Sequence, residues 1–280
     1  MNFKILSDST CDLSQEILEA HNISLVPLTV IKDGKEFKDG VTITPDEIFA
    51  HVAAGGDLCS TSANSVGEYQ EQFAKYADQY DGVLHITIGS GFSSCYQNAS
   101  IAAQEFDNVQ VVDSMNLSTG QGLVVLEAVR LAKECATLGQ LHDKVQAMTD
   151  KVEASFLVDK LAYLAKGGRC SAVAALGANL LNLKPCIDVK DGKMGVSKKY
   201  RGKYAKCLAT YVQERLADRD DIRRDVLFVT KTSVSDEEYA AVMEAVKEYG
   251  QFETVYETLA GCTVSCHCGP GTLGVLFVRK

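Results

Sequence analysis

A loop rich in glycine and serine, "IGSGFSSCY" at residues 88–96, follows an apolar run that predicts a buried strand. Gly89, Gly91 and Ser94 nearly match the glycine fingerprint of a dinucleotide-binding fold. Asp113 ends the next predicted strand, where such folds carry a ribose-binding acid. The third glycine is missing and the loop does not follow the first strand of the chain, so the match to a nicotinamide-binding loop is weak.

The same loop has the donors to bind an anion smaller than a pyrophosphate. A loop that leads into a helix offers unpaired backbone N–H groups and a partial positive charge, and serine hydroxyls add donors without adding charge. No Gly-Lys-Ser/Thr phosphate-loop pattern occurs in the chain. This donor set suits a carboxylate, with Ser93 and the helix start as donors and with Gly89 and Gly91 giving the backbone room to turn.

Hydroxyl groups also gather in other loops. These are "SDST" at 7–10, "STS" at 60–62, "DSMNLSTGQG" at 113–122 and "KGGRCS" at 166–171. The loops at the carboxyl ends of parallel strands meet in one crevice, so we expect these segments to line a common site. Any one serine or threonine is explained equally well as a helix cap. Asp8 and Asp113 are candidate acids, although an Asp beside a Ser more often fixes its own loop through backbone hydrogen bonds.

Arg169 follows two glycines, which would let a backbone approach closely while the guanidinium clamps an anion. The alternative is an exposed arginine after a helix that ends at Lys166 and Gly167.

The segment "GCTVSCHCGPG" at 261–271 contains no Cys-x-x-Cys pair, which argues against a zinc site. We expect a strand here, which would turn Cys262, Cys266 and Cys268 to one face, in the core. His267 would then point the other way, toward a cleft.

The segment "KMGVSKKYRGKYAK" at 193–206 holds several basic residues and no acidic one, in a chain whose net charge is −9. It is either a solvated hairpin or a docking patch for an acidic partner or a phosphorylated ligand, with Lys199 and Arg201 as the candidate contacts.

The elements that must position these residues alternate between strand-like and helix-like patterns in the first half. "ISLVPLTVI" at 23–31 reads as one strand that ends at a turn at Asp33 and Gly34, and a helix is expected from Phe92 to Phe106. Such alternation predicts a mostly parallel sheet with helices on both faces. Capping boxes are expected at three helix starts: Thr44 with Glu47, Ser65 with Glu68, and Ser235 with Glu238.

The second half shows a different pattern. A hairpin is expected around Asp191 and Gly192, and the chain closes with the predicted strands "FETVYE", "TVSCH" and "LGVLFV". We therefore predict an α/β protein of two lobes. Residues 1–160 would carry the mostly parallel sheet and the carboxylate-binding loops, and residues 161–280 would form a smaller α/β lobe built on a mixed or antiparallel sheet.

Composition limits the function classes. The 280 residues are 46% hydrophobic and 23% charged, which suits a globular protein with a large core. The net charge of −9 argues against a general nucleic-acid or membrane-surface binder. Ten cysteines without a secretory leader favour reduced thiols in a cytoplasmic protein, and no apolar run is long enough to span a membrane.

Several of these segments together resemble the DegV family, which includes the fatty-acid-binding subunit (FakB) of bacterial fatty acid kinase. The similar stretches are "SDST", "TSANSVGEY", "ITIGSGFSSCYQNA", "DSMNLSTGQG", "LAYLAKGGRCS", "LKPCIDVKDG", "KKYRGKYA" and "HCGPGTLG". They occur in family order from residue 7 to residue 274. The chain departs from the usual pattern at Gly89, Ser94 and Cys95, and at Ala63 and Asn64, which affects the shape of the pocket rather than the two hydroxyls.

The resemblance implies one long-chain fatty acid, palmitate-like, in a buried tunnel that the lobe of residues 161–280 covers, with its carboxylate between the lobes. Thr61 and Ser93 match the residues that hold the carboxylate in the family. Arg169 and His267 match residues tied to presenting the ligand to a kinase subunit, and Ser62 lies beside Thr61 as a secondary head-group contact.

The resemblance also implies a carrier rather than an enzyme, with no cofactor and no metal. A separate ATP-dependent, FakA-like kinase subunit would convert the carboxylate to an acyl phosphate for phospholipid synthesis. Other classes stay open: an acyl hydrolase or transferase that uses Ser93 with His267, an NAD-dependent oxidoreductase at the Gly89 loop, or a lipid-sensing regulatory protein.

Overall fold

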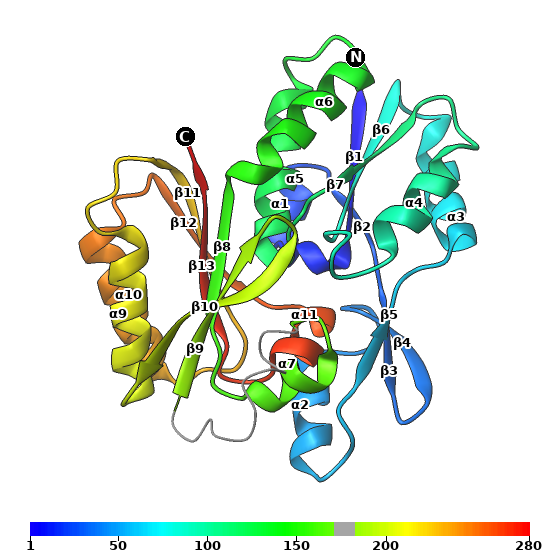
Figure 1. Ribbon diagram of the computed structural model, residues 1–280. Helices are drawn as coiled ribbons and strands as arrows, with labels where there is room; N and C mark the ends of the chain where they lie inside the picture. The colour runs from blue at the N-terminus through cyan, green and yellow to red at the C-terminus, as the bar shows by residue number, and fades with distance from the viewer. Residues whose placement is uncertain (171–182) are drawn as a thin grey trace.

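The computed structural model describes residues 1–170 and 183–280 (Figure 1). Its first sheet is parallel, with strand order β2-β1-β6-β7. The strands are β1 (Phe3–Asp8), β2 (Ser24–Val26), β6 (Gly82–Thr87) and β7 (Val109–Asp113). Because every residue of β6 is buried, both faces of this sheet must be covered.

Helices provide that cover, with α3 and α4 on one side of the sheet and α5 and α6 on the other (Figure 1). The elements of this lobe, in chain order, are the 3₁₀ turn η1 (Ser9–Cys11), α1 (Gln15–Ala20), α3 (Val66–Ala77), α4 (Cys95–Ala103), α5 (Ser118–Ala132), α6 (Leu138–Met148) and the 3₁₀ turn η2 (Thr149–Lys151). The predicted parallel sheet with helices on both faces is confirmed.

A small antiparallel sheet, β4-β3-β5, lies below the first one in Figure 1. It consists of β3 (Thr29–Lys32), β4 (Lys35–Lys38) and β5 (Ser60–Ser62), accompanied by helix α2 (Pro45–Ala53). The single strand predicted at 23–31 is wrong, since the segment divides at Pro27 and Leu28 into β2 and β3, which belong to different sheets. Pro27 lacks the backbone N–H that a continuous strand would need.

The third sheet is mixed, in the order β10-β9-β8-β13-β11-β12, and only β11 and β12 are parallel neighbours. Its strands are β8 (Val152–Leu157), β9 (Leu183–Lys190), β10 (Lys193–Arg201), β11 (Ile222–Lys231), β12 (Thr254–Leu259) and β13 (Leu273–Arg279). Helices α9 (Tyr204–Leu216) and α10 (Asp236–Tyr249) pack together on its outer face (Figure 1). The predicted mixed sheet is confirmed, and the division of the chain at residue 160 stays a prediction.

Two short helices, α7 (Leu161–Gly167) and α11 (Cys262–Cys268), contact each other between the mixed sheet and the small sheet (Figure 1). Helix α11 contributes to two cores. Cys262 and Cys266 pack with Val30 and Ile48 of the small sheet and α2, whereas Cys268 joins the large core of the parallel-sheet lobe. This helix therefore ties together three parts of the molecule.

Local predictions of turns and caps are confirmed. All three expected capping boxes form, at Thr44, Ser65 and Ser235. Asp191 and Gly192 both have positive φ, 51° and 68°, which suits the two-residue turn between β9 and β10. All ten cysteines are buried, and none of them is in a disulfide. Within the described residues, no helix combines the length and the apolar character that a membrane span requires.

Candidate ligand-binding site

A cavity of about 60 Å³ collects polar side chains from four separate segments. Thr61 and Ser62 come from β5, Ser93 from the loop before α4, Arg169 from the loop after α7, and His267 from α11. The other walls are mainly apolar, with Leu28, Ile88, Phe92, Leu117, Leu164 and Met194. The structure thus brings together five residues that the sequence proposed as head-group contacts.

Thr61 and His267, which are 206 residues apart in sequence, join across this cavity. The Thr61 Oγ1 atom lies 2.8 Å from His267 Nε2. Burial, with a smaller effect of the Arg169 charge, lowers the pKa of His267 to about 4. The imidazole is therefore neutral at physiological pH. Its Nδ1 atom has no hydrogen-bond partner among the described residues, and it faces Gly167, where an added Cβ would lie only 2.5 Å away.

Ser93 lies at the entrance to helix α4. Its Oγ donates to Cys95 Sγ at 3.1 Å and accepts from the Cys95 backbone N–H at 3.3 Å. The helix begins at Cys95 rather than at the predicted Phe92 and ends at Ala103. Ser93 consequently stays in the loop, where it lines the cavity just before the start of α4.

The glycines of this loop lie in a turn and also allow close approach of neighbouring backbone. Neither Gly89 nor Gly91 has positive φ. A Cβ on Gly89 would lie 2.9 Å from the Asn116 backbone N, and one on Gly91 would lie 2.1 Å from the Gly192 carbonyl oxygen. The loop therefore packs directly against the β9–β10 hairpin of the other lobe, and both glycines also belong to a turn, in which the Phe92 backbone N–H donates to the Gly89 carbonyl at 2.9 Å.

The strand expected at "TVSCH" is wrong, since the segment forms helix α11. Cys262 and Cys266 are four residues apart and share one helical face, while His267 and Cys268 face the cavity. The three cysteines thus do not share a face. Over seven residues the cysteine spacing fits both a strand and a helix, so periodicity alone could not decide between them.

Two buried aspartates that the sequence did not identify hold the start of α11. Asp39 Oδ1 accepts from the Cys262 backbone N–H at 2.8 Å, and its Oδ2 accepts from the Thr263 N–H at 3.2 Å and from Ser9 Oγ at 2.9 Å. These bonds link the first loop of the parallel-sheet lobe, the end of β4 and α11. No local motif marks Asp39, because its partners are distant in sequence.

Asp12 makes a second link of this kind. Its carboxylate accepts from the Gly261 backbone N–H at 2.9 Å and from Ser118 Oγ at 2.6 Å. Burial raises the pKa of Asp12 to about 8, although both hydrogen bonds favour the ionised form.

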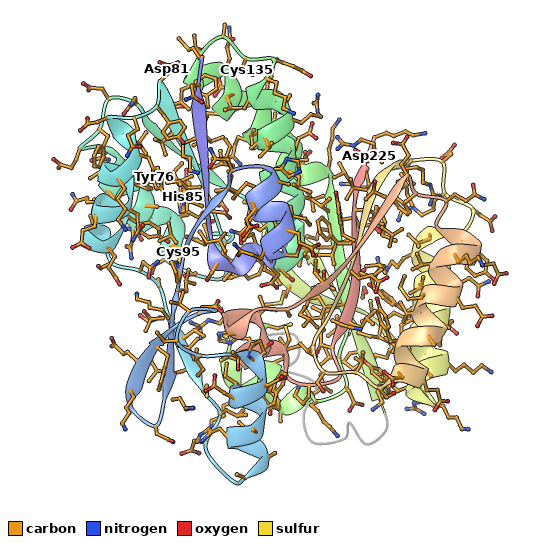
Figure 2. All side chains as sticks on the ribbon, turned by 180° about the vertical axis from the view of Figure 1, so that it is seen from behind. Tyr76, Asp81, His85, Cys95, Cys135 and Asp225 are labelled. Carbon is orange, nitrogen blue, oxygen red and sulfur yellow. The ribbon has the colours of Figure 1, made fainter. Side chains whose placement is uncertain are left out.

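The candidate acids Asp8 and Asp113 fix loops. Asp8 accepts from Tyr69 OH at 2.8 Å and from the Ile88 backbone N–H at 3.0 Å, and it lies 3.1 Å from His85 Nε2. His85 is fully buried in the parallel-sheet lobe, which it shares with Cys95 (Figure 2). Asp113 Oδ1 accepts from the Ser90 and Met115 backbone N–H groups. Neither aspartate lines the cavity.

The remaining predicted residues lie elsewhere. Lys199 and Arg201 are exposed on β10, away from the cavity, and take part in no ion pair among the described residues. Helix α7 ends at Gly167 with Gly168 in the left-handed region, as the alternative interpretation of this segment expected, yet the exposed Arg169 still reaches the cavity wall. Ser171 of "KGGRCS" is outside the described residues.

A second cavity, of about 30 Å³, continues from the first. The two cavities share the lining residues Leu117, Val264 and Cys268, and the deeper one is bounded by Phe156, Val189 and Leu276 of the mixed sheet, among others. Thr61, Ser93 and His267 line only the first cavity. The candidate head-group residues are thus confined to the first cavity. The second cavity is lined by apolar residues together with Ser118, Thr230, Lys231, Thr232 and Thr272. In residues 1–170 and 183–280 no cluster of His, Cys, Asp or Glu side chains could hold a metal ion.

Comparison with known proteins identifies the family of this chain. The sequence profile of the DegV family, whose description calls it uncharacterised, matches residues 2–280. A DegV domain-containing protein of Caldanaerobacter subterraneus subsp. tengcongensis is 30% identical, over 99% of this chain and 98% of the relative. A fatty-acid-binding DegV family protein from Thermus thermophilus superposes with a TM-score of 0.91 at 29% identity, over 100% of both chains.

A stearic-acid-binding protein from Eubacterium ventriosum has a TM-score of 0.83 at 30% identity, over 99% of this chain and 98% of its own. Profile, sequence and fold agree over nearly the whole length, so the chain belongs to the DegV family.

Proposed function

We propose that this protein binds one long-chain fatty acid, such as palmitate, with its carboxylate at Thr61 and Ser93 and its acyl chain between the lobes. The observation that carries this proposal is the single cavity in which Thr61, Ser93 and His267 converge from separate segments. Fatty acid binding by the related proteins from T. thermophilus and E. ventriosum supports the choice of ligand.

Hydroxyl and backbone donors suit a fatty acid head group. An ionised carboxylate buried without partners would be costly, so it needs donors, and His267 is too weakly basic to supply a positive charge. The acyl chain supplies the affinity. Burial at about 0.8 kcal/mol per methylene contributes roughly 10 kcal/mol for a C16 chain before ordering costs, so the head group has only to orient the ligand.

The acyl path requires side chains to move. A cavity must offer about 10–15 Å³ to hold one water molecule. The first cavity, at about 60 Å³, therefore holds only a few groups of that size. A C16 chain must extend into the second cavity, past Leu117, Val264 and Cys268. We propose that these three side chains part when the acyl chain enters.

We propose that the bound carboxylate is presented to a separate ATP-dependent kinase in the cytoplasm. The kinase would transfer the γ-phosphoryl group of ATP to a carboxylate oxygen, giving an acyl phosphate and ADP. The chain has no phosphate-loop motif of its own, which supports a carrier role. Lys199 and Arg201 are exposed cations suited to an acidic partner surface.

An acyl hydrolase is the second candidate, and the geometry disfavours it. A serine nucleophile needs a base within hydrogen-bond reach. Ser93 bonds to Cys95, whereas His267 Nε2 bonds to Thr61.

Mass spectrometry of the ligand extracted from the purified protein tests the proposal. A long-chain fatty acid in near-stoichiometric amount is expected, and a dinucleotide as the sole ligand would refute fatty acid binding. The kinase step has its own test. Replacing Lys199 and Arg201 by Glu should leave palmitate affinity unchanged and reduce acyl phosphate formation by a fatty acid kinase subunit, and unimpaired phosphorylation would rule out the docking role.

A further inference from the structure

Thr263, the second residue of α11, lines the same cavity as Thr61, Ser93 and His267. It is only 4% exposed, and its Oγ1 atom has no hydrogen-bond partner among the described residues. Its backbone N–H, in contrast, is bonded to Asp39. Leaving a buried hydroxyl without a partner costs about 1–3 kcal/mol, so such an atom in a cavity wall indicates a ligand contact.

The position of Thr263 in the helix explains why its hydroxyl is free. A threonine inside a helix commonly bonds to a carbonyl three or four residues earlier. Thr263 is in the first turn, so the residues that would supply this carbonyl, Leu259 and Ala260, precede the helix. The Ala260 carbonyl already accepts from Ser265 Oγ at 3.2 Å. The hydroxyl therefore has no partner within its own helix, and none among the other described residues.

Helical spacing places Thr263 beside the Thr61–His267 pair. Residues four apart share a helix face, and helical side chains lean toward the N-terminus, so the His267 ring extends toward the turn that carries Thr263. Thr61 is held on that ring at 2.8 Å. Thr61 and Thr263 are thus both expected beside His267 in the cavity wall, which Ser93 also lines.

We propose that Thr263 is a third hydroxyl donor to the carboxylate of the bound fatty acid. This inference rests on the proposed function and adds a residue to its site. The neutral His267 leaves the carboxylate without a buried cation, and Arg169 is exposed and donates to the Gly167 carbonyl. An anion in this cavity depends on neutral donors, and a third one stabilises the ionised form further.

The test compares Thr263→Val, which keeps the branched shape and removes the hydroxyl, with Thr263→Ser, which keeps the hydroxyl. Palmitate affinity should fall about tenfold or more in the valine variant, the effect of one hydrogen bond to a charged group, and the serine variant should restore most of it. Affinity for 1-hexadecanol, which has no carboxylate, should change much less. Thr149→Val, at a buried threonine outside the cavity, is the matched control.

NMR titration of palmitate labelled at the carboxyl carbon separates binding from structure. Loss of a donor should raise the pKa of the bound carboxyl in Thr263→Val, and Thr263→Ser should reverse that rise. A folded valine variant with unchanged affinity and unchanged carboxyl pKa would overturn the role of Thr263. If the wild-type protein failed to bind palmitate, the proposed function would fail instead.

Discussion

Helix α11 turns Cys262 and Cys266 toward a small core and turns Thr263 and His267 toward the cavity. On the core face polar groups are satisfied: Cys262 Sγ donates to the Ile43 carbonyl and Asp39 binds the first backbone N–H groups. On the cavity face Thr263 Oγ1 has no partner among the described residues. One short helix thus carries, on different faces, groups that stabilise the fold and the hydroxyl that we propose as a ligand contact, and the presence or absence of a hydrogen-bond partner distinguishes them.

Removal of Asp39 tests the core face most strongly. Asp39→Ala takes the acceptor from the Cys262 and Thr263 N–H groups and from Ser9, so the free energy of unfolding should fall by about 3 kcal/mol or more. Urea denaturation measures this. Asp57→Ala, at a side chain that is 98% exposed, is the control and should have little effect. If Asp39→Ala were as stable as the wild type, the described anchoring of α11 would be incorrect.

Replacement of Thr61 and Ser93 by Ala tests the cavity face. Two hydrogen bonds to a carboxylate are lost, so palmitate affinity should weaken about 100-fold, while the free energy of unfolding should change by less than about 1 kcal/mol. Titration calorimetry and urea denaturation give the two values. If the double variant bound palmitate as tightly as the wild type, the assignment of Thr61 and Ser93 as carboxylate contacts would be incorrect.

The pH dependence of stability tests the Asp12 link. The pKa of Asp12 is raised to about 8 from an ordinary value near 4, so the folded protein binds more protons than the unfolded chain between these values. Its stabilisation is complete below pH 4 and is lost as pH rises through 8. His267, with a pKa lowered to about 4, acts in the opposite direction below about pH 6.5.

Stability should therefore decline between about pH 6.5 and 8, and this decline should flatten in Asp12→Asn. An asparagine still accepts from the Gly261 N–H, and the Ser118 hydroxyl can rotate to accept from it. Thermal unfolding across this range is the measurement, and an equally steep decline in the variant would assign it to another group.

The smallest effect is expected at Cys266, which packs in the small core and lies outside the cavity. Cys266→Ala should cost about 1 kcal/mol of stability and leave the palmitate affinity within about twofold. A large loss of affinity would mean that the two faces of α11 are coupled rather than independent.

Sequence reasoning identified the cavity residues better than the elements that carry them. Thr61, Ser93, Arg169 and His267 stand in short motifs whose order along the chain is informative. Helix α11 was predicted as a strand because, over only seven residues, the spacing of its cysteines fits both the two-residue period of a strand and the 3.6-residue period of a helix.

The anchoring residues were missed for a different reason. Asp12 and Asp39 accept hydrogen bonds from backbone and side-chain groups more than 100 residues away in sequence. The Thr263 hydroxyl lacks a partner in its own helix because no helical turn precedes it. Such roles depend on tertiary contacts and leave no local pattern.

The contact between Gly91 and the Gly192 carbonyl also fixes how near the loop before α4 and the β9–β10 hairpin can come. Because the atom that an added methyl group would meet belongs to the backbone, the methyl group fits only if the loop or the hairpin shifts. Gly91→Ala should therefore push these two segments apart, at a cost in stability. Faster exchange of the bound ligand would report how much of its residence time depends on that single close approach.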